Sequence, residues 1–266
     1  MPDNRDKEDT NMTERIRVKK MNDSIYLLDD NGEATGYLVL GEKRAAIIDT
    51  MNGWADVAAV CRKITELPIT VINTHGHCDH IFGNIYFPGP CLLHPDDFQV
   101  AEEMCCIEEF ANALKENHLT MPPFAPIQDG DEIDLGGLTL QAILLPGHTR
   151  GSICLLLKEQ RVLFTGDSIN RHLWAQLGES LPMKEIVEQL DKIMWVREKA
   201  DRILHGHAQD WEPIELLTMM RNAAAEILTA DTSKDPDYQW FDGTDKHHPY
   251  DEGRATICYR EANLGV

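Results

Sequence analysis

Three histidines and one aspartate fall within the segment His75-Gly76-His77-Cys78-Asp79-His80. They directly follow a short apolar run whose composition is typical of a buried strand. The C-terminal ends of strands are where α/β sheets usually carry their chemistry. Imidazole and carboxylate groups bind divalent transition metals, and side chains two residues apart in an extended segment point to the same side. The spacing therefore predicts two adjacent metal positions, one at His75 and His77 and the next at Asp79 and His80.

Three later segments repeat this order of an apolar run, a turn and a residue of ligand type. They are Pro146-Gly147-His148-Thr149, Thr165-Gly166-Asp167-Ser168 and His205-Gly206-His207. The two small residues before Asp167 would let its carboxylate approach a metal closely. Asp49 also ends an apolar run, where a carboxylate commonly caps a turn.

From about Asp49 to His207, these blocks in this order resemble the signature of the metallo-β-lactamase-fold hydrolases, and the pattern is similar to the glyoxalase II-like branch. The resemblance implies an α/β protein built as a four-layer αββα sandwich. It also implies two divalent metal ions. The ligands of the first would be His75, His77 and His148. The ligands of the second would be Asp79, His80 and His207, with a bridge to both ions from Asp167.

Other positions stay open within this resemblance. His205 competes with His207 for the last ligand position, although the Gly-His step ending at His207 fits the family's pattern better. For Asp49 the resemblance implies hydrogen bonds that orient the metal loop, in place of the turn cap. Four residues lie close enough in sequence to the ligands to contact a substrate, and each is equally compatible with an ordinary loop role: Arg171, His172, Trp174 and His205.

The implied reaction is hydrolysis of an acyl bond (thioester, ester or lactone) by a hydroxide that bridges two divalent ions. Zinc is the first choice of metal, with iron or manganese as alternatives. Bound water with a pKa of about 7 would provide the nucleophile, and the leaving group would take a proton from Asp79 or from metal-bound water. The alternative function is that of a mononuclear non-haem iron persulfide dioxygenase. A phosphodiesterase or a β-lactamase is less favoured, and many β-lactamases carry Cys where this chain has Asp167.

Composition sets the remaining expectations. The formal net charge of −20, from 25 Lys and Arg against 45 Asp and Glu, disfavours nucleic acid and favours a small-molecule substrate. Seven cysteines without a Cys-x-x-Cys pair are typical of a reduced, cytoplasmic protein. No apolar run approaches the roughly 20 residues that cross a bilayer, so no membrane contact is expected. A homo-oligomer is compatible with this composition.

The patterning divides the chain into a disordered tail over 1–15, a catalytic domain over 16–230 and a C-terminal extension over 231–266 with a final strand. Period-two alternation predicts the opening strands, and a period of 3.6 residues predicts one helix from Trp54, before the metal loop, and further helices after it. One continuous helix is expected over 96–117. The proline-rich segment 119–126 is either a connector or a flap over the site.

Overall fold

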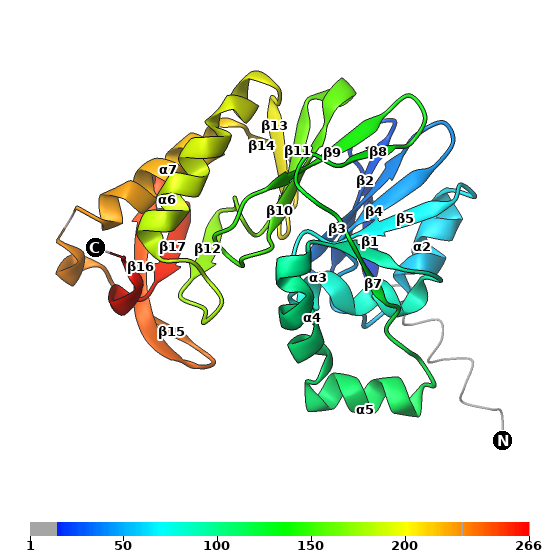
Figure 1. Cartoon of the computed structure of the whole chain (residues 1–266), viewed down its shortest axis with the longest axis horizontal. Coiled ribbons are helices and arrows are strands. Elements are labelled where there is room, and N and C mark those ends of the chain that lie inside the picture. The colour runs from blue at the N-terminus through cyan, green and yellow to red at the C-terminus, as the bar shows by residue number, and fades with distance from the viewer. Residues whose placement is uncertain (1–14, 230, 266) are drawn as a thin grey trace.

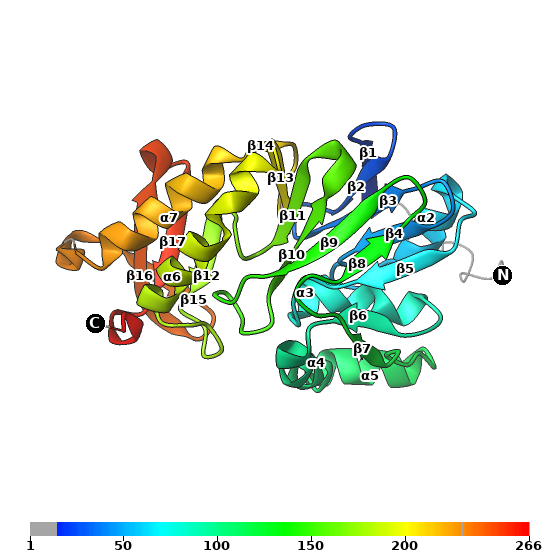
Figure 2. The same ribbon diagram turned by 45° about the horizontal axis from the view of Figure 1, so that its top comes forward.

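The structure is a computed structural model that describes residues 15–229 and 231–265. Two large sheets lie face to face with helices on their outer sides (Figure 1 and Figure 2). The first sheet takes its strands in chain order: β1 (Ile16–Lys20), β2 (Ile25–Asp30), β3 (Thr35–Leu40), β4 (Ala45–Ile48), β5 (Ile69–Ile72), β6 (Cys91–Leu93) and β7 (Phe124–Pro126). Strands β1 to β4 are antiparallel, whereas β4, β5, β6 and β7 run parallel.

The second sheet has the strand order β14-β13-β11-β10-β9-β8. Its strands are β8 (Glu132–Asp134), β9 (Thr139–Leu144), β10 (Ile153–Leu157), β11 (Val162–Gly166), β13 (Arg202–His205) and β14 (Glu212–Pro213). Apolar side chains from both sheets form one buried cluster between them, in which the rings of Tyr37 and Phe164 lie 5.2 Å apart. Strands β10 and β11 are apolar on both faces because this core covers one face and a second apolar cluster covers the other.

Helices complete the outer layers. The first sheet is covered by α2 (Val57–Ile64), which forms the crossover between the parallel strands β4 and β5. The second sheet is covered by α6 (Met183–Ile193) and α7 (Glu215–Ile227), which bury Leu190 and Leu217 against it. The four layers are thus helix, sheet, sheet and helix, which confirms the predicted αββα sandwich. No helix in the described part of the chain is long and apolar enough to span a membrane.

A third, smaller sheet has the order β12-β17-β16-β15. Its strands are β12 (His172–Ala175), β15 (Asp237–Trp240), β16 (Gly243–Tyr250) and β17 (Ala255–Tyr259). Strand β17 lies where the final strand was expected, and it pairs in parallel with β12. The β15–β16 hairpin was not foreseen, because its polar composition hides the alternation of Tyr238 and Trp240. The division of the chain at residue 230 remains a prediction, and the tail expected over 1–15 lies outside the described residues except for Arg15.

The helix expected over 96–117 is wrong in its continuity. The structure has α4 (Phe98–Cys105) and α5 (Glu108–Glu116), with a break at Ile107, whose backbone is extended at φ −56° and ψ 126°. Two acidic residues, Glu108 and Glu109, then favour a new helix start through the helix dipole. The short helix α3 (Cys78–Ile81) carries part of the histidine-rich segment.

Candidate metal centre

Asp49 holds the loop between β5 and α3 in place. Its carboxylate accepts hydrogen bonds from the backbone N–H and the hydroxyl of Thr74, both at 2.7 Å. It also lies 2.9 Å from Nδ1 of His80. A carboxylate can only accept, so Nδ1 of His80 carries a proton, and Nε2 holds a lone pair that faces the centre whenever the ring is neutral. These contacts are those that the predicted orienting role of Asp49 requires, and among the described residues Asp49 belongs to none of the groups that could hold an ion.

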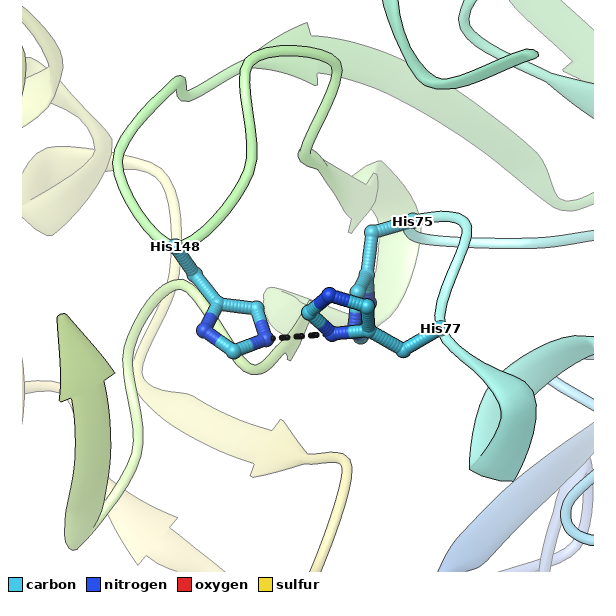
Figure 3. A group of neighbouring side chains, drawn as sticks. All are labelled: His75, His77 and His148. Atoms are coloured by element: carbon cyan, nitrogen blue, oxygen red, sulfur yellow. Dashed lines mark hydrogen bonds between the residues drawn. The ribbon is translucent and has the colours of Figure 1, made fainter. Parts of the chain in front are cut away.

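The first ligand group consists of three imidazoles that converge on one point (Figure 3). His75 and His77 come from the loop after β5, and His148 comes from the turn after β9. Their ligand atoms all lie within 4.8 Å of one another. Nδ1 of His77 and Nε2 of His148 are 2.9 Å apart.

Strand β12 and the loop after it fix which nitrogen of His77 and of His148 faces that point. Nδ1 of His148 donates to the carbonyl of Trp174 at 2.8 Å, and Nε2 of His77 lies 2.7 Å from a carboxylate oxygen of Glu179. Both outer nitrogens are therefore donors, and in neutral rings both inner nitrogens carry lone pairs. Two lone pairs that face each other at 2.9 Å repel unless a proton or a cation lies between them. This geometry fits a bound metal ion.

The second ligand group adds negative charge. Asp79, His80 and His207 place their ligand atoms within 4.8 Å of one another. Oδ2 of Asp79 lies 3.5 Å from Nε2 of His80 and 3.6 Å from Nε2 of His207. Nδ1 of His207 donates to the carbonyl of Glu33 at 2.8 Å, which again leaves Nε2 free to face the centre.

Asp167 lies between the two groups. Its carboxylate is 3.1 Å from Nε2 of His207, 3.6 Å from Nε2 of His80 and 3.8 Å from Nε2 of His148. It also forms a third ligand group with His75 and His80. Residue 167 therefore stands where a bridging ligand would be needed.

Three buried atoms in this centre have no hydrogen-bond partner among the described residues: Nε2 of His75, Nε2 of His80 and Oδ1 of Asp167. Buried polar atoms in folded proteins are almost always satisfied. Imidazole nitrogen and carboxylate oxygen are donors that divalent transition metals accept. The orphaned atoms therefore fit metal ions as their missing partners.

The surroundings tune the histidines in opposite directions. Burial and the neighbouring imidazoles hold the pKa of His75 well below its usual value, and burial lowers the pKa of His148 to about 4. Burial also opposes charge on His80 and His207, but the nearby carboxylates outweigh it. They raise the pKa of His80 well above its usual range and that of His207 to about 9. A metal that binds the second group must therefore displace protons.

His205 points to a different role. It lies outside every ligand group, while its Nδ1 accepts a hydrogen bond from the backbone N–H of His207 at 3.2 Å. Burial lowers the pKa of His205 to about 4. The structure therefore places His207 with the ligands and leaves His205 on the wall of the adjoining cavity.

A cavity of about 650 Å³ opens directly onto both ligand groups. All four residues suggested as substrate contacts line it. Arg171 is not free to bind an anion, because its guanidinium pairs with Glu212 through two hydrogen bonds and with Asp251 at 2.7 Å. Nε2 of His172 lies 3.2 Å from the buried thiol of Cys258. Other lining residues were not foreseen from the sequence: Met104, Ile107, Leu177, Glu179 and Phe241.

Glu179 is the most informative of the missed residues. It lies 102 positions from His77 in the sequence and belongs to no motif. Its hydrogen bond to His77 outweighs its burial and lowers the pKa of its carboxyl group. In the sequence, Glu179 is an acidic residue in the loop after Trp174, and nothing in that loop indicates that it contacts His77.

Residues 30–219 match the family model of the metallo-beta-lactamase superfamily. The chain belongs to this superfamily. It is 27% identical over 207 residues to the acyl-coenzyme A thioesterase MBLAC2 of Gallus gallus, which covers 67% of this chain and 74% of that protein. It is 25% identical over 240 residues to MBLAC2 of Homo sapiens, with coverage of 77% and 85%. It is also 31% identical over 161 residues to the atrochrysone carboxyl ACP thioesterase AgnL7 of Paecilomyces divaricatus, with coverage of 59% and 45%.

Solved structures agree at the level of the fold. A metallo-beta-lactamase from Pontibacter korlensis superposes with a TM-score of 0.59 at 19% identity, covering 79% of this chain and 99% of that one. The sec-alkyl sulfatase PisA1 from Pseudomonas sp. gives a TM-score of 0.62 at 14% identity, covering 80% and 42%. The predicted superfamily is confirmed, and with it a hydrolase that binds divalent metal. The glyoxalase II-like branch, zinc as the metal and the cytoplasmic location remain predictions.

Proposed function

We propose that this protein is a thioesterase that holds two divalent metal ions, zinc in the first instance. The first ion would be held by His75, His77 and His148. The second would be held by Asp79, His80 and His207, with Asp167 shared between them. The observation that carries the proposal is the convergence, at the floor of a largely apolar cavity, of buried ligand atoms that have no partner in the described part of the chain.

The chemistry that the ions supply when bound is an acidified water and a polarised carbonyl group. The chain's own part is to orient these reactants. His148 and His207 line the cavity together with Asp79 and Asp167, so a carbonyl that enters the cavity meets ligands of both groups. This arrangement lowers the entropic cost of bringing nucleophile and acyl carbon together.

Asp79 is the residue that we assign to proton transfer. Burial opposes its ionisation, but the charge and hydrogen bond of His80 and the charge of His207 hold the pKa of the Asp79 carboxyl well below its usual range. Oδ2 of Asp79 is therefore ionised near neutral pH and able to accept a proton from the attacking water. A thiol leaving group has a pKa of about 8.5, so it departs readily as a thiolate and needs less proton donation than an alcohol or amine. This favours a thioester over the ester and lactone alternatives.

The names of the relatives support the same substrate class, since MBLAC2 is named an acyl-coenzyme A thioesterase and AgnL7 an ACP thioesterase. The two names agree on the thioester bond and differ in its carrier, which is coenzyme A in one and ACP in the other. The net charge of −20 makes an uncharged model thioester the cleaner first substrate, because it removes repulsion of the carrier's phosphates.

The test is to load metal-free protein with Zn²⁺, count bound ions by elemental analysis and measure hydrolysis of S-acyl-N-acetylcysteamine thioesters. We expect two ions per chain and metal-dependent release of free thiol. In His77→Ala, metal content and hydrolysis should both fall, the latter by orders of magnitude. His118→Asn is the matched control, since His118 is exposed and has a left-handed backbone that Asn tolerates.

Three further substrates separate the alternatives. Oxygen uptake by the iron-loaded protein with a persulfide substrate would indicate the dioxygenase. Turnover of a β-lactam or of a chromogenic phosphodiester, without turnover of any thioester, would replace the proposed function. A protein that binds zinc normally yet hydrolyses no acyl bond would refute it.

A further inference from the structure

The apolar side of the cavity is built from two parts of the chain that are far apart in sequence. Met104 and Ile107 come from the end of α4 and the break before α5, whereas Trp174 and Leu177 come from β12 and the loop after it. Phe241 joins them from the tip of the β15–β16 hairpin. Figures 1 and 2 both show the hairpin and the α4–α5 pair on different sides of the molecule's centre.

The hairpin is joined to the centre by a chain of aromatic contacts. The ring of Trp174 lies 6.2 Å from Tyr238, 5.9 Å from Trp240 and 5.9 Å from Phe241. The rings of Trp240 and Phe241 are 4.8 Å apart. The carbonyl of Trp174 also accepts a hydrogen bond from His148, so Trp174 links the hairpin to the first ligand group.

Phe241 itself is almost uncovered. Its exposed fraction is 84%, and Ile107 across the cavity is 38% exposed. The neighbouring Trp240 is fixed, since its indole N–H donates to Asp245 at 2.8 Å and the guanidinium of Arg260 lies 5.9 Å from its ring. The tip of the hairpin thus exposes the ring of Phe241, while the neighbouring Trp240 is held in place. Apolar side chains held at the mouth of a site in this way are typical of ligand-binding surfaces.

The two halves of a thioester differ in what they need from this wall. An acyl chain needs apolar surface, whereas the carrier of an acyl-coenzyme A or acyl carrier protein brings phosphate. Among the cavity-lining residues that the structure describes, Arg171 is the one Lys or Arg, and its charge is taken up by Glu212 and Asp251. The cavity therefore suits the acyl half.

We infer that Phe241 and Trp174, together with Met104 and Ile107 on the other side, bind the hydrocarbon chain of an acyl group, and that the hairpin tip sets the preference for chain length. This inference rests on the proposed thioesterase function and extends it. It assigns the β15–β16 hairpin, which lies outside the residues 30–219 matched by the family model, to substrate selection.

The test compares acetyl and octanoyl thioesters of N-acetylcysteamine in zinc-loaded protein. Each methylene that leaves water should raise kcat/KM by about fourfold until the apolar wall is filled. In Phe241→Ala, the ratio of kcat/KM for octanoyl to acetyl should fall by about tenfold or more, because a large ring no longer covers the chain. The variant should fold, since the side chain is exposed. Trp195→Ala is the matched control: Trp195 is 45% exposed but lines a different cavity, and the ratio should not change.

Binding of a hydrolytically inert octyl thioether of N-acetylcysteamine, measured by calorimetry, gives a readout independent of turnover. We expect its Kd to rise by about tenfold or more in Phe241→Ala and not in Trp195→Ala. Thioether binding that depends on Phe241, without thioester turnover, would remove the proposed function and keep the acyl site. Thioester turnover with an unchanged octanoyl-to-acetyl ratio in Phe241→Ala would overturn the inference and keep the function. Absence of thioether binding by the unmodified protein would also overturn the inference.

Discussion

The two ligand groups differ in what they are made of and in what holds them. His75, His77 and His148 are all imidazoles, and two of them are oriented by Trp174 in β12 and by Glu179 in the loop after it. The second group includes a carboxylate, and its His80 is oriented from the end of β4 by Asp49. The pKa of His148 is lowered to about 4, whereas that of His207 is raised to about 9. Identical side chains are thus prepared differently: His75 and His148 are held neutral, whereas His80 and His207 are charged and paired with carboxylates.

Removal of Asp167 should have the largest effect, because both groups lose a shared neighbour. Without its carboxylate, two dications held close together would repel with less negative charge between them. We expect Asp167→Ala to bind fewer than two zinc ions per chain and to lose thioester hydrolysis by roughly a thousandfold or more. Elemental analysis and thiol release measure the two effects. Retention of two ions with near-normal turnover would show that the groups do not depend on a shared carboxylate.

Replacement of Asp49 tests the second group alone. In Asp49→Asn the amide oxygen is kept toward the backbone N–H of Thr74, so the amide N–H₂ faces His80. The proton of His80 would then move to Nε2, and this nitrogen could no longer bind an ion. We expect one of the two zinc-binding events in calorimetry to weaken by about 10–100-fold, while the other stays as it was. If both events weaken equally, Asp49 supports the whole loop and not one group.

Replacement of Glu179 is the corresponding test for the first group, because Glu179 contacts His77. Its side chain is 29% exposed and has room to rotate, unlike the buried Asp49. Glu179→Ala should weaken the other zinc-binding event by about 10–100-fold, and Glu179→Gln should recover most of the affinity because its amide oxygen still accepts from His77. Combined with Asp49→Asn, the loss should be additive, as expected for separate sites. A double variant no worse than the worse single variant would mean that both residues act on one ion.

The contrast also shows what the sequence can reveal. The predicted ligands follow strand ends, and the resemblance of their motifs to the family signature was enough to predict that His75, His148 and His207 lie near one another, although they follow β5, β9 and β13 of two different sheets. What orients them was harder to foresee. Asp49 was foreseen because it too ends a strand, but Glu179 lies in an irregular loop, and only the tertiary fold brings it to His77.

The part of the apolar wall formed by the hairpin tip and Ile107 was missed for a related reason. Trp240 and Phe241 sit in a stretch of polar residues whose strand pattern is weak, and the break at Ile107 contains neither glycine nor proline to mark it. Both features depend on packing: β16 is held by β17, which in turn pairs with β12. Such long-range pairing overrides local propensity. The floor of the site and one part of its wall, Trp174, were therefore predictable, whereas the rest of the apolar wall was not.

The smallest expected effect concerns Asp97, which joins the two loops of the first group. Its buried carboxylate accepts hydrogen bonds from the N–H of Gly76 at 2.8 Å, the hydroxyl of Thr149 at 2.7 Å and the N–H of Gly151 at 2.7 Å. In Asp97→Asn, the amide N–H₂ must face at least one of these donors. A buried donor left without a partner should lower the free energy of unfolding by about 1–3 kcal/mol, measured by urea denaturation of the metal-free protein.

Asp96→Asn is the control, since the carboxylate of Asp96 is 62% exposed. If Asp97 acts on the first group alone, the zinc-binding event weakened by Asp49→Asn should keep its affinity in Asp97→Asn. Loss of that event as well would mean that the two groups share one scaffold, and the difference between them would then reside in their ligands and not in the loops behind them.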